Sequence, residues 1–332
     1  MRVQDVSSSC IFFKCQIINR ILNSYPLYFK LTYMAERVLL HDNSSKVRQW
    51  NLFQNTPRYT TSLKANLTLD QRNNRINPSR GYYLDFSTEL ALGGLGSSLV
   101  SNIENNISKQ SNHNLMSSGL LYLKPKASGN NFIRYLTNAR FYYDFDNWFI
   151  WKGFILKKNF ELGFLNDFGN PLYFENFFLG GLTSLRGYAS RSISTSKRVS
   201  GLNPFDKKTD LKIGGVKDIH GSLELEFPLI NFIKLNAVLF LDYGNVYSHE
   251  DNLFFAGKIS KSASMIKVND PLKIYDTLGL YSSVGFGFRW DSPMGLLRFE
   301  WGFPLVKRKK GTPSLPLGDA PFSFEFGGGT SF

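Results

Sequence analysis

The sequence contains no uninterrupted apolar run of about 18 residues, the length that a transmembrane helix requires. It therefore does not predict a helical membrane protein, although 42% of its 332 residues are hydrophobic. The first 25 residues also lack a secretory signal peptide, because they have no basic start and Lys14 interrupts their apolar run. Two explanations stay open: the protein takes no secretory route, or its original N-terminus lies upstream of Met1.

Residues that carry enzymatic chemistry are scarce. The two cysteines, Cys10 and Cys15, have a spacing that fits no zinc or redox motif, and no pair of the four histidines has metal-ligand spacing. The sequence contains no phosphate-binding glycine loop, and Ser184 does not lie in a nucleophile-elbow pattern. We therefore expect a protein that is not an enzyme and that has no metal and no cofactor.

The net charge of +13 first suggests a nucleic-acid partner. The basic residues are scattered along the chain, however, and the only dense run is Lys307–Lys310. This run falls between two strand patterns, and we interpret it as a solvated hairpin loop. The sequence thus predicts no nucleic-acid partner.

From about residue 60, apolar and polar residues alternate with a period of two, which is typical of strands with one apolar face. In Thr61–Asp70, for example, every second residue is apolar, starting at Leu63. Two long segments, 93–131 and 165–215, lack this alternation and are expected to be irregular. About nine strands are predicted, at approximately 61–70, 82–90, 132–145, 148–164, 216–228, 233–247, 279–291, 295–305 and 321–332.

The composition of the two strand faces favours a membrane barrel. Large aromatic residues such as Phe286 and Trp290 dominate the apolar face, whereas Arg, Glu, Asp, Ser and Gly occupy the other. We predict an all-β fold, a transmembrane antiparallel β-barrel with a polar lumen, over residues 60–332. A soluble β-sandwich or soluble barrel, which also alternates, is the alternative. Residues 1–59 are either a poorly ordered lead or one or two further strands.

The sharpest local feature is the segment 180–188, with the sequence GGLTSLRGY. Its paired glycines allow a tight turn, and Arg186 needs a carboxylate partner if the loop is buried. Glu224, Glu226 and Asp242 each alternate with apolar residues, so their side chains would face the lumen. A loop folded into the lumen would bring Arg186 against Glu224 and Asp242. The alternative is an ordinary exposed arginine in a surface loop.

The segment NPLYFENFFLGGLTSLRGYASRSIS closely resembles the sixth-loop signature of the outer-membrane barrel-assembly superfamily, also called the bacterial surface antigen family. Two further segments resemble family hairpins: LTLDQRNNRINPSRGYYLDFSTELA, which reads closest to mitochondrial members, and RWDSPMGLLRFEWGFPL. The resemblance implies that the inward acidic partners of the loop are Asp242 and Glu224, with Glu226 as the alternative register. The matched loop residues are Gly180, Gly181, Leu185, Arg186, Gly187 and Tyr188.

Barrels of this family have sixteen strands, so about nine strands would form the C-terminal portion of such a barrel. Neither the first strand of the barrel nor the family's soluble N-terminal module is recognisable in the sequence. Three explanations stay open. Residues 1–60 are a divergent remnant, the gene prediction is truncated, or a partner completes the barrel.

The resemblance implies an ATP-independent factor that inserts β-barrel proteins into an outer membrane, similar to the mitochondrial sorting and assembly machinery pore. Its expected partners are membrane lipids, unfolded β-barrel precursors and accessory subunits of an assembly complex. The expected location is the mitochondrial outer membrane, with a plastid or bacterial outer membrane as alternatives, and the basic charge weakly favours an organelle. The terminal edge strand would pair with the precursor, and it carries Phe322, Phe324, Phe326 and Phe332.

A rival function from another class is a protein-translocating outer-membrane pore of the chloroplast-import or two-partner secretion type. A third interpretation is an inactive fragment of a barrel.

Overall fold

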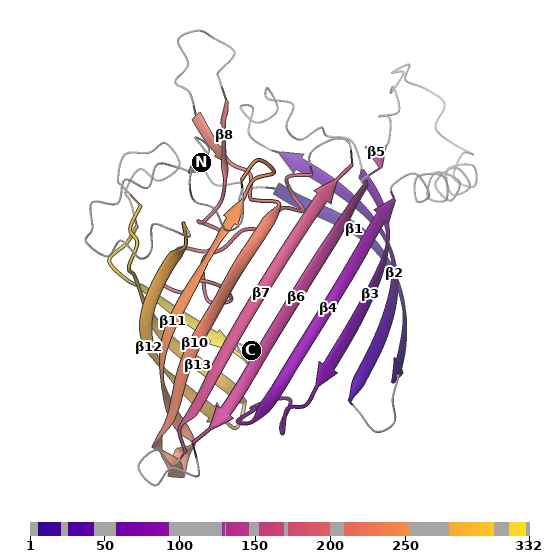
Figure 1. Ribbon diagram of the computed structural model, residues 1–332. Helices are drawn as coiled ribbons and strands as arrows, with labels where there is room; N and C mark the ends of the chain where they lie inside the picture. The colour runs from indigo at the N-terminus through magenta and orange to yellow at the C-terminus, as the bar shows by residue number, and fades with distance from the viewer. Residues whose placement is uncertain are drawn as a thin grey trace, which may run out of the picture.

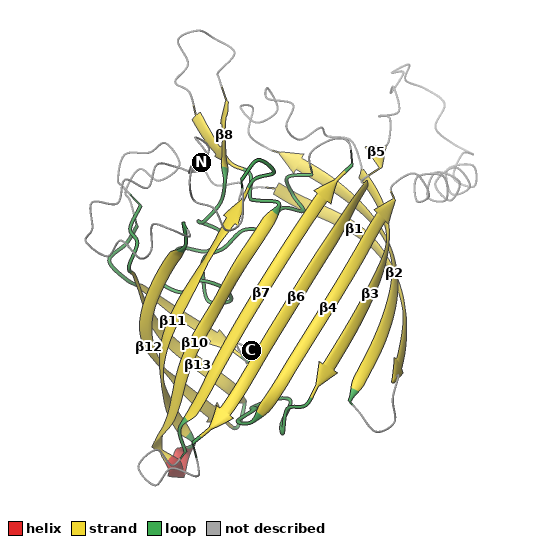
Figure 2. Ribbon diagram, in the orientation of Figure 1, coloured by secondary structure: helices red, strands yellow, loops and turns green. Residues whose placement is uncertain are grey.

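The computed structural model has β-strands as nearly all of its regular secondary structure in the described residues (Figures 1 and 2). No helix in the described ranges is both long and apolar enough to cross a membrane. The structure describes residues 6–20, 26–42, 58–92, 128–129, 131–145, 153–168, 172–199, 209–251, 279–308 and 319–329.

In the described ranges, eleven strands pair side by side and antiparallel, in the order in which they occur along the chain. Figure 1 shows them as tilted neighbours in one curved wall, with short connections such as the β3–β4 turn at its lower end. The strands are β1 (Val6–Arg20), β2 (Leu27–Asp42), β3 (Arg58–Asp70), β4 (Gly81–Leu92), β6 (Asn131–Asp144), β7 (Ile155–Asp167), β10 (Lys217–Ile230), β11 (Leu235–Tyr247), β12 (Tyr281–Ser292), β13 (Gly295–Pro304) and β14 (Ser323–Gly328).

Three short strands lie off this path. β5 (Ser128–Gly129) pairs with β3, and β8 (Ser196–Val199) pairs with β9 (Thr209–Lys212) as a separate two-stranded sheet. A 3-10 turn, η2 (Asn231–Ile233), joins β10 to β11 and is the red element in Figure 2. Strands β1 and β14 stand at the two ends of the strand order, and the described residues show no pairing between them.

All nine expected strands are present among the described residues, and the all-β barrel-type fold is confirmed, but two expected boundaries were wrong in detail. Residues 1–59 contain the two further strands that were the alternative for this region, because β1 and β2 extend the strand order of the described residues to eleven. In β2, Tyr28 and Met34 occupy the otherwise polar face and obscure the alternation. The segment expected to be irregular, 165–215, contains β8 and β9. The strand expected over 148–164 is β7, which begins at Ile155, and residues 148–152 lie outside the described residues.

The register gives the sheet one apolar and one polar face. Across β11, β12 and β13, Leu241 is aligned with Val284, and Val284 with Phe303. Most apolar side chains on this face are exposed: Leu239 is 50% exposed and Phe286 is 43% exposed, whereas Leu241 is half-buried. On the opposite face, Glu224, Asp242 and Glu300 have no exposed surface at all.

This distribution is the reverse of that in a soluble protein, where large apolar side chains are buried and charges face water. It fits a wall that meets lipid on its outer face and encloses polar groups on its inner face. The β-sandwich alternative is wrong, because the described ranges form one large sheet and no second large sheet covers its apolar face.

The buried apolar core lies between the inner face and the loop 172–195. One cluster joins loop residues Leu185 and Tyr188 to Val246 of β11 and Tyr281 of β12. A second cluster joins Leu172 to strand residues that include Phe132 and Leu165. The loop therefore provides the core that the sheet by itself lacks.

The orientation of the faces predicts that Leu239→Arg destabilises the protein in a bilayer. Arginine at a lipid-facing site near the middle of the membrane costs about 2–4 kcal/mol, and the cost falls towards zero near the interface. Urea unfolding of vesicle-inserted protein would measure the difference. Ile76→Arg is the matched control, because Ile76 is 74% exposed but lies in the β3–β4 turn. Equal unfolding midpoints for both variants would contradict this orientation.

Candidate functional site

The segment 172–195 connects β7 to β8 and folds against the inner face of the sheet. Two isolated bridges hold it, Phe177 with Gly215 and Leu179 with Ile193. Gly180 and Gly181 have φ angles of 109° and 95°, values that strongly favour glycine, and they form the expected tight turn. The turn brings Arg186 into the interior, where it is only 3% exposed. The alternative of a surface-exposed arginine is therefore wrong.

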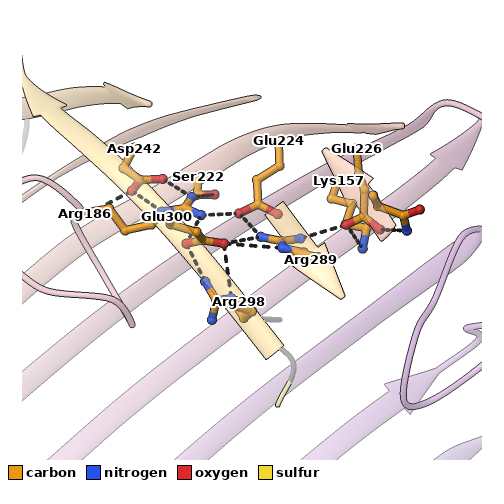
Figure 3. Close-up of polar contacts among 10 residues, drawn as sticks. Lys157, Arg186, Ser222, Glu224, Glu226, Asp242, Arg289, Arg298 and Glu300 are labelled. Atoms are coloured by element: carbon orange, nitrogen blue, oxygen red, sulfur yellow. Dashed lines mark hydrogen bonds and ion pairs between the residues drawn. The ribbon is translucent and has the colours of Figure 1, made fainter. Parts of the chain in front are cut away.

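Arg186 binds Asp242 through three nitrogen atoms. Its Nε lies 2.7 Å from Asp242 Oδ2, its Nη2 lies 2.6 Å from Oδ1, and its backbone N–H donates to Oδ2 over 3.0 Å. Its Nη1 donates to Glu224 Oε1 over 2.6 Å and to Glu300 Oε2 over 3.0 Å (Figure 3). Its Nη2 also donates to Ser222 Oγ over 3.3 Å. All five N–H groups of the guanidinium therefore have acceptors.

The charge of Arg186 is stabilised by an aromatic ring as well as by the acceptors of its N–H groups. Its guanidinium carbon lies 3.6 Å from the centre of the Phe240 ring, a cation–π contact. Burial by itself would lower the pKa of the guanidinium, but the charges of Asp242 and Glu224 outweigh burial and raise that pKa well above its ordinary value. The loop thus presents a permanent cation to the wall.

The contacts of Arg186 are part of a larger network on the inner face (Figure 3). Arg289 donates to Glu224 over 2.8 Å and to Glu226 over 2.9 Å, and it also contacts Glu300. Arg298 donates to Glu300 over 2.8 Å, and Lys157 to Glu226 over 2.9 Å. Four cations therefore meet four carboxylates, and the network has no net charge. Its members are Lys157, Arg186, Arg289, Arg298, Glu224, Glu226, Asp242 and Glu300.

The structure brings Arg186, Glu224 and Asp242 into contact. Glu226 belongs to the same network but is linked to it through Arg289 and Lys157. Glu226 pairs with Lys157 and Arg289, and it also accepts a hydrogen bond from Asn236 over 2.8 Å. Of the two registers considered, Glu224 is thus the residue that touches the loop arginine.

Two further residues of the motif, Gly187 and Tyr188, fix the position of the loop against the inner face of the sheet. A Cβ atom added to Gly302 of β13 would lie 2.4 Å from the backbone nitrogen of Gly187, so the two backbones are in direct contact. The Tyr188 hydroxyl lies 2.9 Å from the Ser282 carbonyl oxygen and 2.8 Å from that of Val306. Burial raises the pKa of this hydroxyl, which therefore remains a donor.

Sequence reasoning did not single out four members of the network around Arg186: Glu300, Arg289, Arg298 and Lys157. The first three were visible as polar residues that alternate with aromatic residues in β12 and β13, but nothing ranked them above other polar positions. The expectation for the basic run at 307–310 was wrong for Arg308. This residue is 12% exposed and pairs with Asp319, rather than lying in a solvated loop.

The terminal strand β14 lies at one end of the strand order and pairs with β13. Its outward residues Phe324 and Phe326 are 50% and 59% exposed, and Phe322, which directly precedes the strand, is 50% exposed. Phe332, which we also expected on this edge, lies outside the described residues. On the inner side, Glu325 accepts a hydrogen bond from the Gly187 backbone over 3.4 Å. The loop therefore touches the terminal strand as well as the wall.

An antiparallel wall with an apolar outer face, a polar inner face and an arginine loop folded inside defines the class of an outer-membrane β-barrel. The profile of the Omp85 superfamily domain matches residues 10–332. Because this match covers nearly the whole chain, the protein belongs to the Omp85 superfamily.

Curated relatives and solved structures agree with this assignment. The chain is 34% identical over 146 residues to the outer membrane protein assembly factor BamA of Nitratidesulfovibrio vulgaris, covering 44% of this chain and 15% of that protein. It is 30% identical over 193 residues to BamA of Neisseria meningitidis serogroup B, covering 54% of this chain and 22% of that protein. The chain thus spans less than a quarter of the length of either relative.

The fold is similar to that of BamA from Haemophilus ducreyi lacking POTRA domains 1–3. The TM-score is 0.62 at 17% identity, over 98% of this chain and 55% of that one. It is also similar to CdiB from Escherichia coli, with a TM-score of 0.52 at 14% identity, over 97% of this chain and 47% of that one. At these identities the likeness concerns the fold alone.

The geometry predicts that Arg186→Lys releases the loop although it retains the charge. Lysine has three donors and no planar fork, so at least two of the five side-chain bonds of Arg186 are lost. Each buried acceptor left without a partner costs about 1–3 kcal/mol. Limited proteolysis of the segment 172–195 and the unfolding midpoint would both report the loss. Arg191→Lys, an exposed position in the same loop, is the control, and equal behaviour of the two variants would contradict the prediction.

Proposed function

We propose that this chain contributes to the assembly and insertion of β-barrel proteins in an outer membrane, by a non-enzymatic and ATP-independent mechanism. The observation that carries the proposal is the Arg186 loop, which is anchored by a charge-balanced network on the inner face and reaches the terminal strand. The sequence likeness to two bacterial assembly factors supports the same function.

In this proposal the two sides of the site have different tasks. The ionic network holds the loop and the strands β10–β13 as one rigid unit, because separating any buried partner leaves an uncompensated charge. β14 would present its outer edge to the terminal strand of an unfolded precursor, which adds to the sheet by β-augmentation. Backbone hydrogen bonds formed during pairing supply the driving force, so no nucleotide is required.

The partners follow from the same arrangement. Lipids would meet the exposed aromatic face, and unfolded β-barrel precursors would meet the edge of β14. Accessory subunits of an assembly complex are the third kind of partner in this proposal, as the family resemblance implies.

We further propose the mitochondrial outer membrane as the location. The hairpin at residues 67–91 resembles that of mitochondrial family members, and the net charge of +13 weakly favours an organelle. The two curated relatives described above are bacterial proteins, which makes a bacterial outer membrane the main alternative. Imaging a tagged copy of the protein would distinguish a mitochondrion, a plastid and a bacterial envelope.

A protein-translocating pore is the second candidate function, and its support is the fold likeness to CdiB. The two functions differ in what passes the wall. A translocation pore moves its substrate through the lumen, whereas an insertion factor passes it sideways into lipid at the strand edge. A precursor that becomes protease-protected and membrane-integrated favours insertion, and a soluble substrate released on the other side favours translocation.

The function predicts that Arg186→Ala or Arg186→Glu in a complementing copy impairs β-barrel biogenesis. Glutamate should be the more severe change, because it places a fifth carboxylate among the four already present. The measurement is the steady-state level and the heat-modifiable folding of resident outer-membrane barrels. Arg191→Ala controls for expression, and normal biogenesis in both Arg186 variants would refute the proposed role of the loop.

A further inference from the structure

The terminal strand is weakly held by its own sheet. β14 has six residues, Ser323–Gly328, whereas its neighbour β13 has ten. In the register of these strands, Glu325 lies directly opposite Glu300, and both side chains point to the inner face. Two acidic side chains directly opposite each other provide no favourable cross-strand contact. Pairing with β13 therefore accounts for only part of what keeps β14 in place.

The loop supplies part of the remaining support at the middle of the strand. The Gly187 N–H donates to Glu325 over 3.4 Å. A Cβ atom added to Gly327 would lie 2.3 Å from Leu182 Cδ2, so the loop packs directly against the backbone of β14. These contacts join β14 to the same loop that Arg186 anchors.

Arg308 makes a second connection where the chain approaches β14. Its Nε lies 3.1 Å and 3.0 Å from the two carboxylate oxygens of Asp319, and its backbone N–H donates to Asp319 Oδ2 over 2.7 Å. Asp319 lies four residues before Ser323, the first residue of β14, and its side chain is 4% exposed. The ion pair thus closes the connection between β13 and β14 at its base.

The same guanidinium also reaches the loop. Its Nη2 donates to Ser192 Oγ over 2.9 Å, and its Nη1 donates to the Ser192 carbonyl oxygen. The guanidinium carbon lies 5.6 Å from the ring centre of Tyr188 and 5.8 Å from that of Tyr281. One side chain therefore joins three segments: the residues that follow β13, the residues that precede β14 and the loop 172–195.

We propose that Arg308, Asp319 and Ser192 form a clamp that fastens the terminal strand to the loop, and that opening this clamp releases β14. Arg308 is a positioning residue in this scheme, because it acts through the strand and not on a precursor. The clamp sets how often the edge of β14 separates from β13. Its use in pairing with a precursor rests on the proposed function.

The test is hydrogen exchange of backbone amides in the full-length chain, folded in lipid nanodiscs, without any precursor. Arg308→Gln should raise the exchange rate of the β14 amides about tenfold, the size expected for losing one buried charge-assisted pair. The amides of β10 should keep their rates, because the Arg186 network is untouched. Asp319→Asn removes the same pair from the other side and should give the same increase.

A matched control exists in the chain. Arg72 and Asp70 form an ion pair of similar burial, with side chains 10% and 9% exposed and an Nε–Oδ1 distance of 2.8 Å, at the end of β3. Arg72→Gln should leave the β14 amides unchanged. The double variant Arg308→Asp/Asp319→Arg, which swaps the two charges, should recover part of the protection of the β14 amides against hydrogen exchange.

Two results would overturn the clamp: unchanged exchange of β14 in both single variants, or an equal increase throughout the sheet. An insertion assay with the same variants addresses the proposed function separately. Faster exchange of β14 with unchanged precursor insertion would uphold the clamp and count against the role of β14 in insertion.

Discussion

The buried guanidinium of Arg186 constrains most of the structure around it. A charge with no access to water requires partners on every side, and here Asp242, Glu224 and Glu300 provide them from three different strands. Removing any one partner would leave an uncompensated buried charge. The position of the loop and the mutual register of β10, β11 and β13 are therefore determined together.

The network also explains why the register is unique. A two-residue slip of β10 would keep its polar face inward and would bring Glu226 to the position of Glu224. Glu226, however, already pairs with Lys157 and accepts from Asn236. The slip would separate these contacts while moving Glu224 away from Arg289. Alternation alone tolerates this slip, and the ion pairs exclude it.

Lipid outside and charge inside reverse the ordinary distribution of residues, and the consequence is a fold that depends on its loop. The sheet exposes Leu239, Phe286 and Phe324 outward, where they can contribute only in a bilayer. Its inner face is too polar to form a core without a cover. The loop 172–195 supplies Leu185 and Tyr188 as that cover, and it also contacts β14. Anchoring, core formation and control of the edge strand thus share one segment.

The sequence by itself determined the strands β3, β4, β6, β7 and β10–β14 and their two faces, because a period of two is a local property that each segment carries alone. It also pointed to Arg186, Glu224 and Asp242, because the loop motif and the inward acids are readable in order. The tertiary structure alone decided the rest. Glu300 meets Arg186 across 114 residues, and Arg308 meets Ser192 across 116, because strands distant in sequence curve around one loop. Such contacts depend on the register and curvature of the whole wall, which no local pattern encodes.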